Sequence, residues 1–119
     1  TYNDASDEAL SCESYELLTD VNLNDPLIVD TSTCPVVSII IPVYGKVAYT
    51  YSCLKAISNN CLNHNFEVIV VDDCSPDNTR EVISYVTGVR LVENESNLGF
   101  IRSCNKGAKE AKGKYLLFL

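Results

Sequence analysis

The chain has 119 residues, of which 46% are hydrophobic, as expected for one globular domain with a buried core. No apolar run approaches the roughly 20 residues of a membrane span, and the first residues lack the basic and apolar regions of a signal peptide. The formal net charge of -7 argues against nucleic-acid binding through a basic surface. These properties predict a cytoplasmic protein.

The acidic residues are unevenly distributed along the chain. Residues 1–45 contain eight acidic residues and no Lys or Arg, whereas all nine basic residues lie between Lys46 and Lys114. We interpret residues 1–35 as an acidic N-terminal appendage or linker. Residues 36–119 have the regular alternating pattern of a folded domain.

The six cysteines are irregularly spaced, without a C-x-x-C motif, and the single His64 offers little for a zinc site. Several of them lie in apolar or helical patterns, where a free cysteine packs as a small hydrophobic residue. Disulfides are rare in the cytosol. We therefore expect reduced thiols.

From residue 36 onward, strand patterns alternate with helix patterns. Runs such as "VVSIIIPVY" are typical of strands buried on both faces, and apolar residues at helical spacing follow them. Strands are predicted at residues 36–44, 66–71, 89–94 and 114–119, and helices at residues 48–60, 75–86 and 99–113. This alternation predicts an α/β fold with a Rossmann-like, mostly parallel sheet flanked by helices.

Two of the predicted helices carry distinctive local signals. Ser75 is a suitable N-cap for the second helix, and Pro76 suits its first helical position. In the third helix, Asn105 and Gly107 are poor helix formers. Close packing or a ligand contact is therefore expected at these two positions.

Parallel sheets of this kind bind ligands beyond the carboxyl ends of their strands. Three segments fall there, at residues 42–45, 72–77 and 93–99. Asp72 and Asp73 end the second strand, and adjacent strand residues point to opposite faces, so a shared proton is not expected. The pair could bind a base or a sugar, hold a metal ion, or accept backbone N–H groups and cap the next helix.

Two other segments offer binding groups at the same edge. In "PVYG", Pro42 suits the end of the strand ladder, and Tyr44 offers an aromatic face that can stack on a base or sugar. In "NESNLGF", a turn precedes a helix whose N-terminus favours anions, and Arg102 lies in the first turn. A diphosphate could bind at this helix.

Three phrases in the chain, "VSIIIPVYGK", "FEVIVVDDCSPDNT" and "NLGFIRSCNKGAKEAKGKYLLFL", resemble the N-terminal, nucleotide-binding half of family-2 glycosyltransferases, which have the GT-A fold. The resemblance covers residues 36–119. It implies that the base pocket is lined by Pro42, Val43 and Tyr44. It also implies that Asp73 accepts a hydrogen bond from the base, that Asp72 supports the nucleoside, and that Arg102 approaches the diphosphate. The family commonly has Asn where this chain has Gly45.

The resemblance also implies a function for the complete protein. Family members transfer a sugar from a nucleotide-diphosphate donor, often UDP-linked, to an acceptor hydroxyl, usually with inversion. The acceptor would be a glycan or a lipid-linked molecule in glycan or polysaccharide synthesis, and the enzyme could be peripheral to the membrane. A divalent metal, Mn or Mg, is expected for the complete enzyme. Its ligands, in a D-x-D-like motif, and the catalytic base would follow Leu119, so we expect this fragment to be inactive by itself.

Two alternatives have other functions. The chain could be a non-catalytic module that binds nucleotides or associates through its acidic N-terminal residues. It could also self-associate through the uncovered edges of an unfinished sheet. The run "VIVVDD" is also similar to the acidic pocket of a receiver-type signalling domain. In that class, however, the acidic pair follows the first strand and a phosphoacceptor Asp ends a later strand. Here the pair follows the second strand, and no Asp occurs after Asp77.

Overall fold

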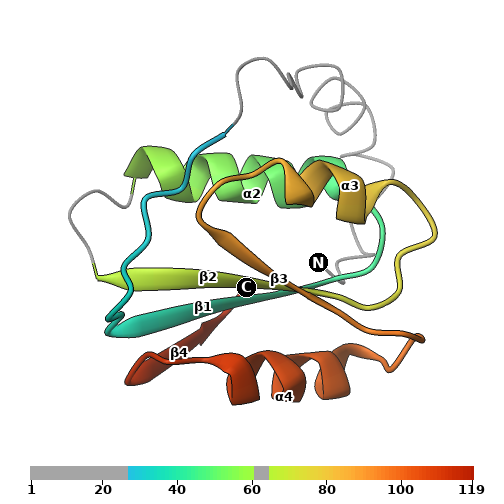
Figure 1. Ribbon diagram of the computed structural model, residues 1–119. Helices are drawn as coiled ribbons and strands as arrows, with labels where there is room; N and C mark the ends of the chain where they lie inside the picture. Colours follow the sequence, from blue (N-terminus) through green and yellow to red (C-terminus); the bar gives the residue numbers. More distant parts are fainter. Residues whose placement is uncertain (1–26, 61–64) are drawn as a thin grey trace.

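The computed structural model describes residues 27–60 and 65–119. Within them the elements are β1 (Val37–Val43), α2 (Val47–Asn60), β2 (Phe66–Asp72), α3 (Thr79–Ser84), β3 (Val89–Glu93), α4 (Phe100–Glu110) and β4 (Tyr115–Phe118). The strands pair in parallel in the order β3-β2-β1-β4. Helices α2 and α3 cover one face of the sheet and α4 covers the other (Figure 1). The predicted α/β fold with a parallel sheet is confirmed.

The central strands β1 and β2 are apolar on both faces because each face meets a helical layer. Ile39, Ile41 and Val43 pack in a larger core toward α2 and α3, whereas Ile40 joins a smaller core toward α4. Side chains of successive strand residues point to opposite faces, so a continuous β-branched run supplies both cores. The strand ends are in register, with Val43 opposite Asp72.

Helix α4 approaches the sheet closely at one glycine. A Cβ on Gly107 would lie 2.5 Å from the Cγ2 atom of Ile40 and 3.0 Å from that of Val71. Only a residue without a side chain fits at these distances. The predicted close packing at Gly107 is therefore confirmed, and it accounts for a poor helix former in the middle of the helix.

The predicted start of the second helix was wrong. Helix α3 begins at Thr79, and Ser75 is not its N-cap. The hydroxyl of Ser75 instead donates to the carboxylate of Asp72, and the Thr79 N–H donates to Asp77 Oδ1 at 3.0 Å. Asp72 and Asp77 thus accept hydrogen bonds from Ser75 and Thr79, and these bonds keep residues 75–78 in a turn.

Residues before β1 lie against the domain. Val29 is buried in the larger core, and its N–H donates to the Thr87 carbonyl at 2.8 Å. The N–H of Ser32 donates to the Phe66 carbonyl at 2.9 Å. The part of the predicted appendage that the structure describes is therefore tied to β2 and to the α3–β3 connection. Residues 1–26 lie outside the described residues.

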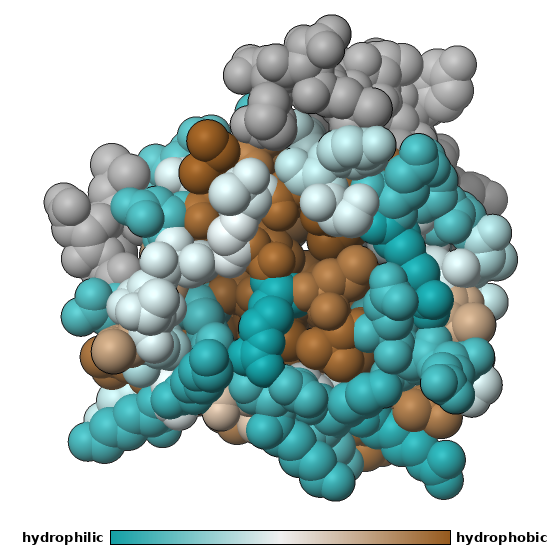
Figure 2. All heavy atoms as spheres, viewed as in Figure 1, coloured by the Kyte–Doolittle hydropathy of each residue, from teal (hydrophilic) through white to brown (hydrophobic). Residues whose placement is uncertain are grey.

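Both edges of the sheet are open in the described part of the chain. The side chains of β4 are exposed along its whole length, and β3 is partly exposed. Figure 2 shows apolar side chains gathered over the middle of the face that Figure 1 presents, between α2 and α4, with hydrophilic side chains around them. None of the described helices is long and apolar enough to cross a bilayer.

The thiols of four cysteines, Cys34, Cys53, Cys74 and Cys104, are free. Burial raises the pKa of the Cys53 thiol, and a smaller degree of burial raises the pKa of Cys104. The prediction of reduced thiols holds for these four residues. Cys12 and Cys61 lie outside the described residues.

Candidate functional site

The three predicted strand-end segments meet at the carboxyl edge of β1, β2 and β3. The N–H of Gly45, just after β1, donates to Ser75 Oγ at 2.8 Å. The N–H of Asp73 donates to the Val43 carbonyl at 2.8 Å, and the N–H of Asn94 donates to the Asp72 carbonyl at 2.8 Å. These bonds make one connected site from segments that are far apart in sequence.

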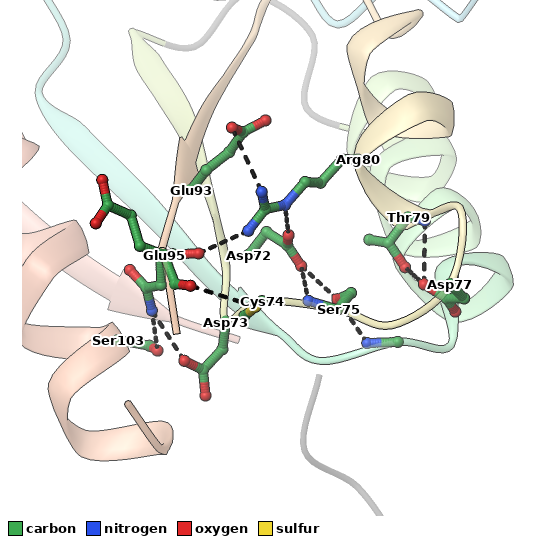
Figure 3. A network of polar contacts seen from close by, with 12 residues as sticks. Asp72, Asp73, Cys74, Ser75, Asp77, Thr79, Arg80, Glu93, Glu95 and Ser103 are labelled. Carbon is green, nitrogen blue, oxygen red and sulfur yellow. Dashed lines mark hydrogen bonds and ion pairs between the residues drawn. The ribbon is translucent and has the colours of Figure 1, made fainter. Parts of the chain in front are cut away.

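Asp72 faces the side of the sheet that carries α2 and α3. It is 0% exposed. Its Oδ2 accepts a hydrogen bond from Arg80 Nε, and its Oδ1 accepts from the Ser75 hydroxyl and, at 3.2 Å, from the Ser75 N–H (Figure 3). A carboxylate buried in this way is compensated by a charged donor and a local turn.

Arg80 links the ends of β2 and β3. Besides the bond to Asp72, its Nη2 donates to the Asn94 carbonyl at 2.6 Å, and its Nη1 lies 3.7 Å from Glu93 Oε2. The hydrogen bond to Asp72 is the main cause that raises the pKa of Arg80 above its ordinary value. Arg80 is therefore a permanent cation whose planar group spans three acceptors.

Asp73 faces the opposite side, toward α4, so the predicted opposite orientations of the pair are confirmed (Figure 3). It is also 0% exposed. Its Oδ1 accepts from the Leu98 N–H at 2.6 Å and from Asn94 Nδ2 at 3.0 Å, and its Oδ2 accepts from the Gly99 N–H at 2.9 Å. The carboxylate therefore fixes the turn that leads into α4, where the helix dipole favours negative charge.

Asn94 is buried between Asp73 and α4. Its Nδ2 also donates to Ser103 Oγ at 3.0 Å. Its Oδ1 is buried and has no hydrogen-bond partner among the described residues. The side chain thus joins the end of β3 to Asp73 and to the first turn of α4.

The turn after β1 has a left-handed backbone. Gly45 has φ 66° and Lys46 has φ 55°. Glycine adopts this conformation without strain, and Asn is among the residues that tolerate it best. The departure from the family's usual Asn is therefore compatible with the same turn.

The other predicted residues differ in accessibility. Pro42 and Val43 are buried, whereas Tyr44 is 39% exposed at the same strand end. Arg102 is exposed on the first turn of α4. A ligand approaching this edge therefore meets Tyr44 before it meets either aspartate.

Sequence reasoning missed Arg80, Asn94 and Ser103 as members of this site. Asn94 had a usable signal, because it lies in a segment that the topology places at the crevice. Arg80 was counted only as part of a helix whose start was misplaced. Ser103 had no signal in the sequence.

The described residues do not form a metal site. None of their His, Cys, Asp and Glu side chains gather in groups of three or more that could hold an ion. Asp72 and Asp73 open to opposite faces, and their oxygens accept hydrogen bonds from protein donors. This arrangement does not fit the several oxygen ligands that a divalent cation requires.

Known proteins similar to the chain point to one family. The family glycosyl transferase family 2 matches residues 38–119. An uncharacterized glycosyltransferase of Haemophilus influenzae is 42% identical over 82 residues, which cover 69% of this chain and 28% of that protein. The glycosyltransferase AglE of Haloferax volcanii is 36% identical over 95 residues, covering 75% of this chain and 31% of that protein.

Solved structures show the same architecture. The crystal structure of S. aureus TarS 1–349 matches with a TM-score of 0.60 and 28% identity, covering 70% of this chain and 26% of that one, and TarS has also been solved with UDP. The mannosyltransferase PcManGT of Pyrobaculum calidifontis, solved with GDP-Man and Mn²⁺, matches in fold with a TM-score of 0.56, 22% identity and 90% and 35% coverage of the two chains. The chain spans about a quarter to a third of the length of these relatives. The resemblance seen in its three motifs is confirmed, and the chain belongs to glycosyl transferase family 2.

Proposed function

We propose that this chain is the donor-binding part of a glycosyltransferase that uses a UDP-linked sugar. The observation that carries the proposal is the convergence of an exposed tyrosine, two buried aspartates and a helix N-terminus at the carboxyl edge of the sheet. Open parallel sheets bind nucleotides at this edge. The likeness to TarS, which was solved with UDP and with UDP-GlcNAc, supports UDP as the nucleotide.

In this proposal the base lies against Tyr44, above the strand end formed by Pro42 and Val43. An exposed aromatic face adds stacking energy to a planar ligand. Asp73 accepts the N–H of the base. Because Asp73 is fully buried, this contact requires displacement of the Leu98 or Gly99 N–H that it now binds.

The diphosphate lies at the N-terminus of α4 in the same proposal. The first N–H groups of a helix have no partner within the helix and favour anions. Arg102 is exposed in the first turn and supplies a positive charge. Asp72 supports the nucleoside from the other face of the sheet, through the turn at Ser75.

The chemical step belongs to the whole protein. We propose transfer of the sugar to a hydroxyl of a glycan or lipid-linked acceptor, with inversion. The divalent metal, its ligands and the general base lie outside these 119 residues in this proposal, because the chain spans only 28% of a relative such as the Haemophilus influenzae protein. The chain alone then binds the donor without transferring the sugar.

Titration with UDP tests the donor site. We expect measurable binding by the wild-type chain and at least severalfold weaker binding by Tyr44→Ala, since stacking on an aromatic ring contributes about 1 kcal/mol or more. Tyr85→Ala is the matched control, because Tyr85 is also exposed but lies at the end of α3. Equal affinity in the Tyr44 variant and the control would contradict the pocket, and GDP binding as tightly as UDP would contradict the choice of nucleotide.

A second proposed role is self-association through β4. The residues from Tyr115 to Leu119 are all exposed, uncharged and apolar or aromatic, and β4 forms one edge of the described sheet. An exposed apolar edge strand can pair with another chain. We expect the sedimentation coefficient of the wild-type protein to rise with concentration, and the Leu117→Lys variant to sediment as a monomer at every concentration. Ile101→Lys, at an exposed apolar residue of α4, should leave the association unchanged.

A further inference from the structure

Arg80 has an unusual place among the arginines of this chain. Its guanidinium binds the side chain at the end of β2 and the main chain at the end of β3, while its own backbone belongs to α3. Removing the head group would unlink three elements at the point where the proposed ligand binds. Nothing in the proposed chemistry uses this residue directly.

The contacts of Arg80 reach both aspartates. One bond goes directly to Asp72. A second goes to the carbonyl of Asn94, whose side chain donates to Asp73 at 3.0 Å. The N–H of Asn94 also donates to the carbonyl of Asp72. A single cation therefore couples two carboxylates that lie on opposite faces of the sheet.

Arginine suits this role better than lysine would. The planar guanidinium has donors fixed in a fork, so it can bind a carboxylate and a carbonyl at the same time. A lysine ammonium carries the same charge but lacks that rigid spread. The Arg80 side chain is also partly accessible, with 37% of it exposed, so the group that couples the two carboxylates lies at the rim of the site and not in the core.

We propose that Arg80 is a positioning residue for nucleoside binding, which acts through Asp72 and Asn94 and sets the spacing of the β2 and β3 ends. This role rests on the proposed donor function. It makes the affinity for UDP depend on the contacts of the guanidinium fork as well as on its charge. Most of the dependence runs through Asp72, so removal of that carboxylate should remove most of it, whereas the bond to the Asn94 carbonyl can remain.

A matched control exists at the other end of β3. Arg90 has almost the same side-chain exposure, 39%, and also pairs with carboxylates, those of Glu67 and Glu110. It lies near the amino end of the sheet, away from the proposed site. Replacing each arginine by glutamine therefore removes a partly exposed guanidinium from a buried carboxylate at each end, Asp72 at one end and Glu67 at the other.

UDP titration of the 119-residue protein tests the role. We expect Arg80→Gln to weaken UDP binding about tenfold or more, as for loss of a charge-assisted hydrogen bond, and Arg90→Gln to change it by less than about twofold. Arg80→Lys should recover only part of the affinity. In an Asp72→Asn background, Arg80→Gln should cause little further loss, because the two residues act as one unit.

A second measurement uses the wild-type protein and is independent of folding defects in variants. In a ¹H–¹⁵N spectrum, UDP should shift the Nε–H resonance of Arg80 and leave that of Arg90 in place. Equal affinity losses for the two glutamine variants, or an unmoved Arg80 resonance in a protein that binds UDP, would overturn the role of Arg80 alone. Absence of UDP binding by the wild type would overturn the donor proposal, and this role with it.

Discussion

The two ends of the parallel sheet both bury acidic side chains, but they use them differently. At the amino end, Glu67 Oε1 accepts from Ser38 Oγ at 2.6 Å and from the Lys112 N–H at 2.7 Å, and Ser38 Oγ accepts from the Gly113 N–H at 2.8 Å. These bonds fasten the connection between α4 and β4 to the sheet. The turn is closely packed there, because a Cβ on Gly113 would lie 2.7 Å from the Ser38 nitrogen.

At the carboxyl end, two acids lie on opposite faces of the sheet and bind different donors. Asp73 accepts hydrogen bonds from the N–H groups of the turn that leads into α4, and Asp72 accepts a hydrogen bond from Arg80. Helix α4 is complemented at both of its ends, since Arg90 Nη1 donates to the Glu110 carbonyl at 2.9 Å near its C-terminus. At the carboxyl end the exposed ring of Tyr44 follows β1, the strand next to the acids, whereas the exposed ring at the amino end, that of Tyr115, lies on the edge strand β4. Burial of acids therefore marks structure at both ends, and the accessible groups beside them distinguish the proposed binding end.

The largest expected effect is that of removing Asp73. Asp73→Ala leaves the Leu98 and Gly99 N–H groups without their acceptor and leaves the Asn94 amide bonded to Ser103 alone, which should lower the free energy of unfolding by about 3 kcal/mol. Urea unfolding measures the loss. Because the same change removes the proposed acceptor for the base, UDP binding should also be lost in the fraction that stays folded. Full UDP affinity in a folded Asp73→Ala protein would contradict the proposal that the carboxyl end of the sheet binds the nucleotide and the amino end does not.

The matched change at the amino end is Glu67→Ala. It removes the acceptor of Ser38 and Lys112 and should lower the free energy of unfolding by about 2 kcal/mol. The affinity for UDP should be unchanged in the folded protein, because Glu67 lies at the opposite end of β2. A large loss of UDP affinity without a loss of stability would show that this end also takes part in binding.

A smaller effect is expected midway along α4. Gly107→Ala places a Cβ against Ile40 and Val71, and overpacking should outweigh the better helix propensity, for a net loss of about 1 kcal/mol. Thermal unfolding measures it, with Lys109→Ala on the exposed face of α4 as the control. Stabilisation by Gly107→Ala would mean that the helix can move away from the sheet without cost.

The smallest expected effect is a change in thiol reactivity. Cys74 lies beside the acids at the carboxyl end, whereas Cys34 is exposed just before β1, near the amino end. Saturating UDP should slow alkylation of Cys74 severalfold and leave Cys34 unchanged, as read by peptide mass spectrometry. Cys53 should react slowly near neutral pH and faster as the pH rises, because burial raises its thiol pKa and less thiolate is present at a given pH. Equal protection of Cys34 and Cys74 would contradict a site at one end only.

Most of the fold was predictable from local patterns. The β-branched runs and the helical spacing placed every described strand and helix, because each pattern follows from the layer against which that element packs. The start of α3 was the main error. The sequence "SPDNT" has two candidate starts, and only the tertiary contact between Ser75 and Asp72 removes Ser75 from the helix.

The candidate site was predictable only in part. The motifs and the topology rule located Tyr44, Asp72 and Asp73 at one edge. The partners of the acids were not visible, because Arg80 is eight residues from Asp72 and Asn94 is 21 residues from Asp73. Such contacts depend on how α3 and β3 lie beside β2, and this arrangement cannot be predicted from a local sequence pattern.

The sequence by itself determined the family, the parallel α/β architecture and the edge at which we propose that a ligand binds, because apolar periodicity and strand-end residues can be read from neighbouring positions in the chain. The tertiary structure alone decided that both aspartates are buried and held by the chain's own donors. It also decided that Arg80 and Asn94 connect them. The physical reason is that a buried charge requires partners, and those partners come from whichever segments the packing brings within hydrogen-bond distance.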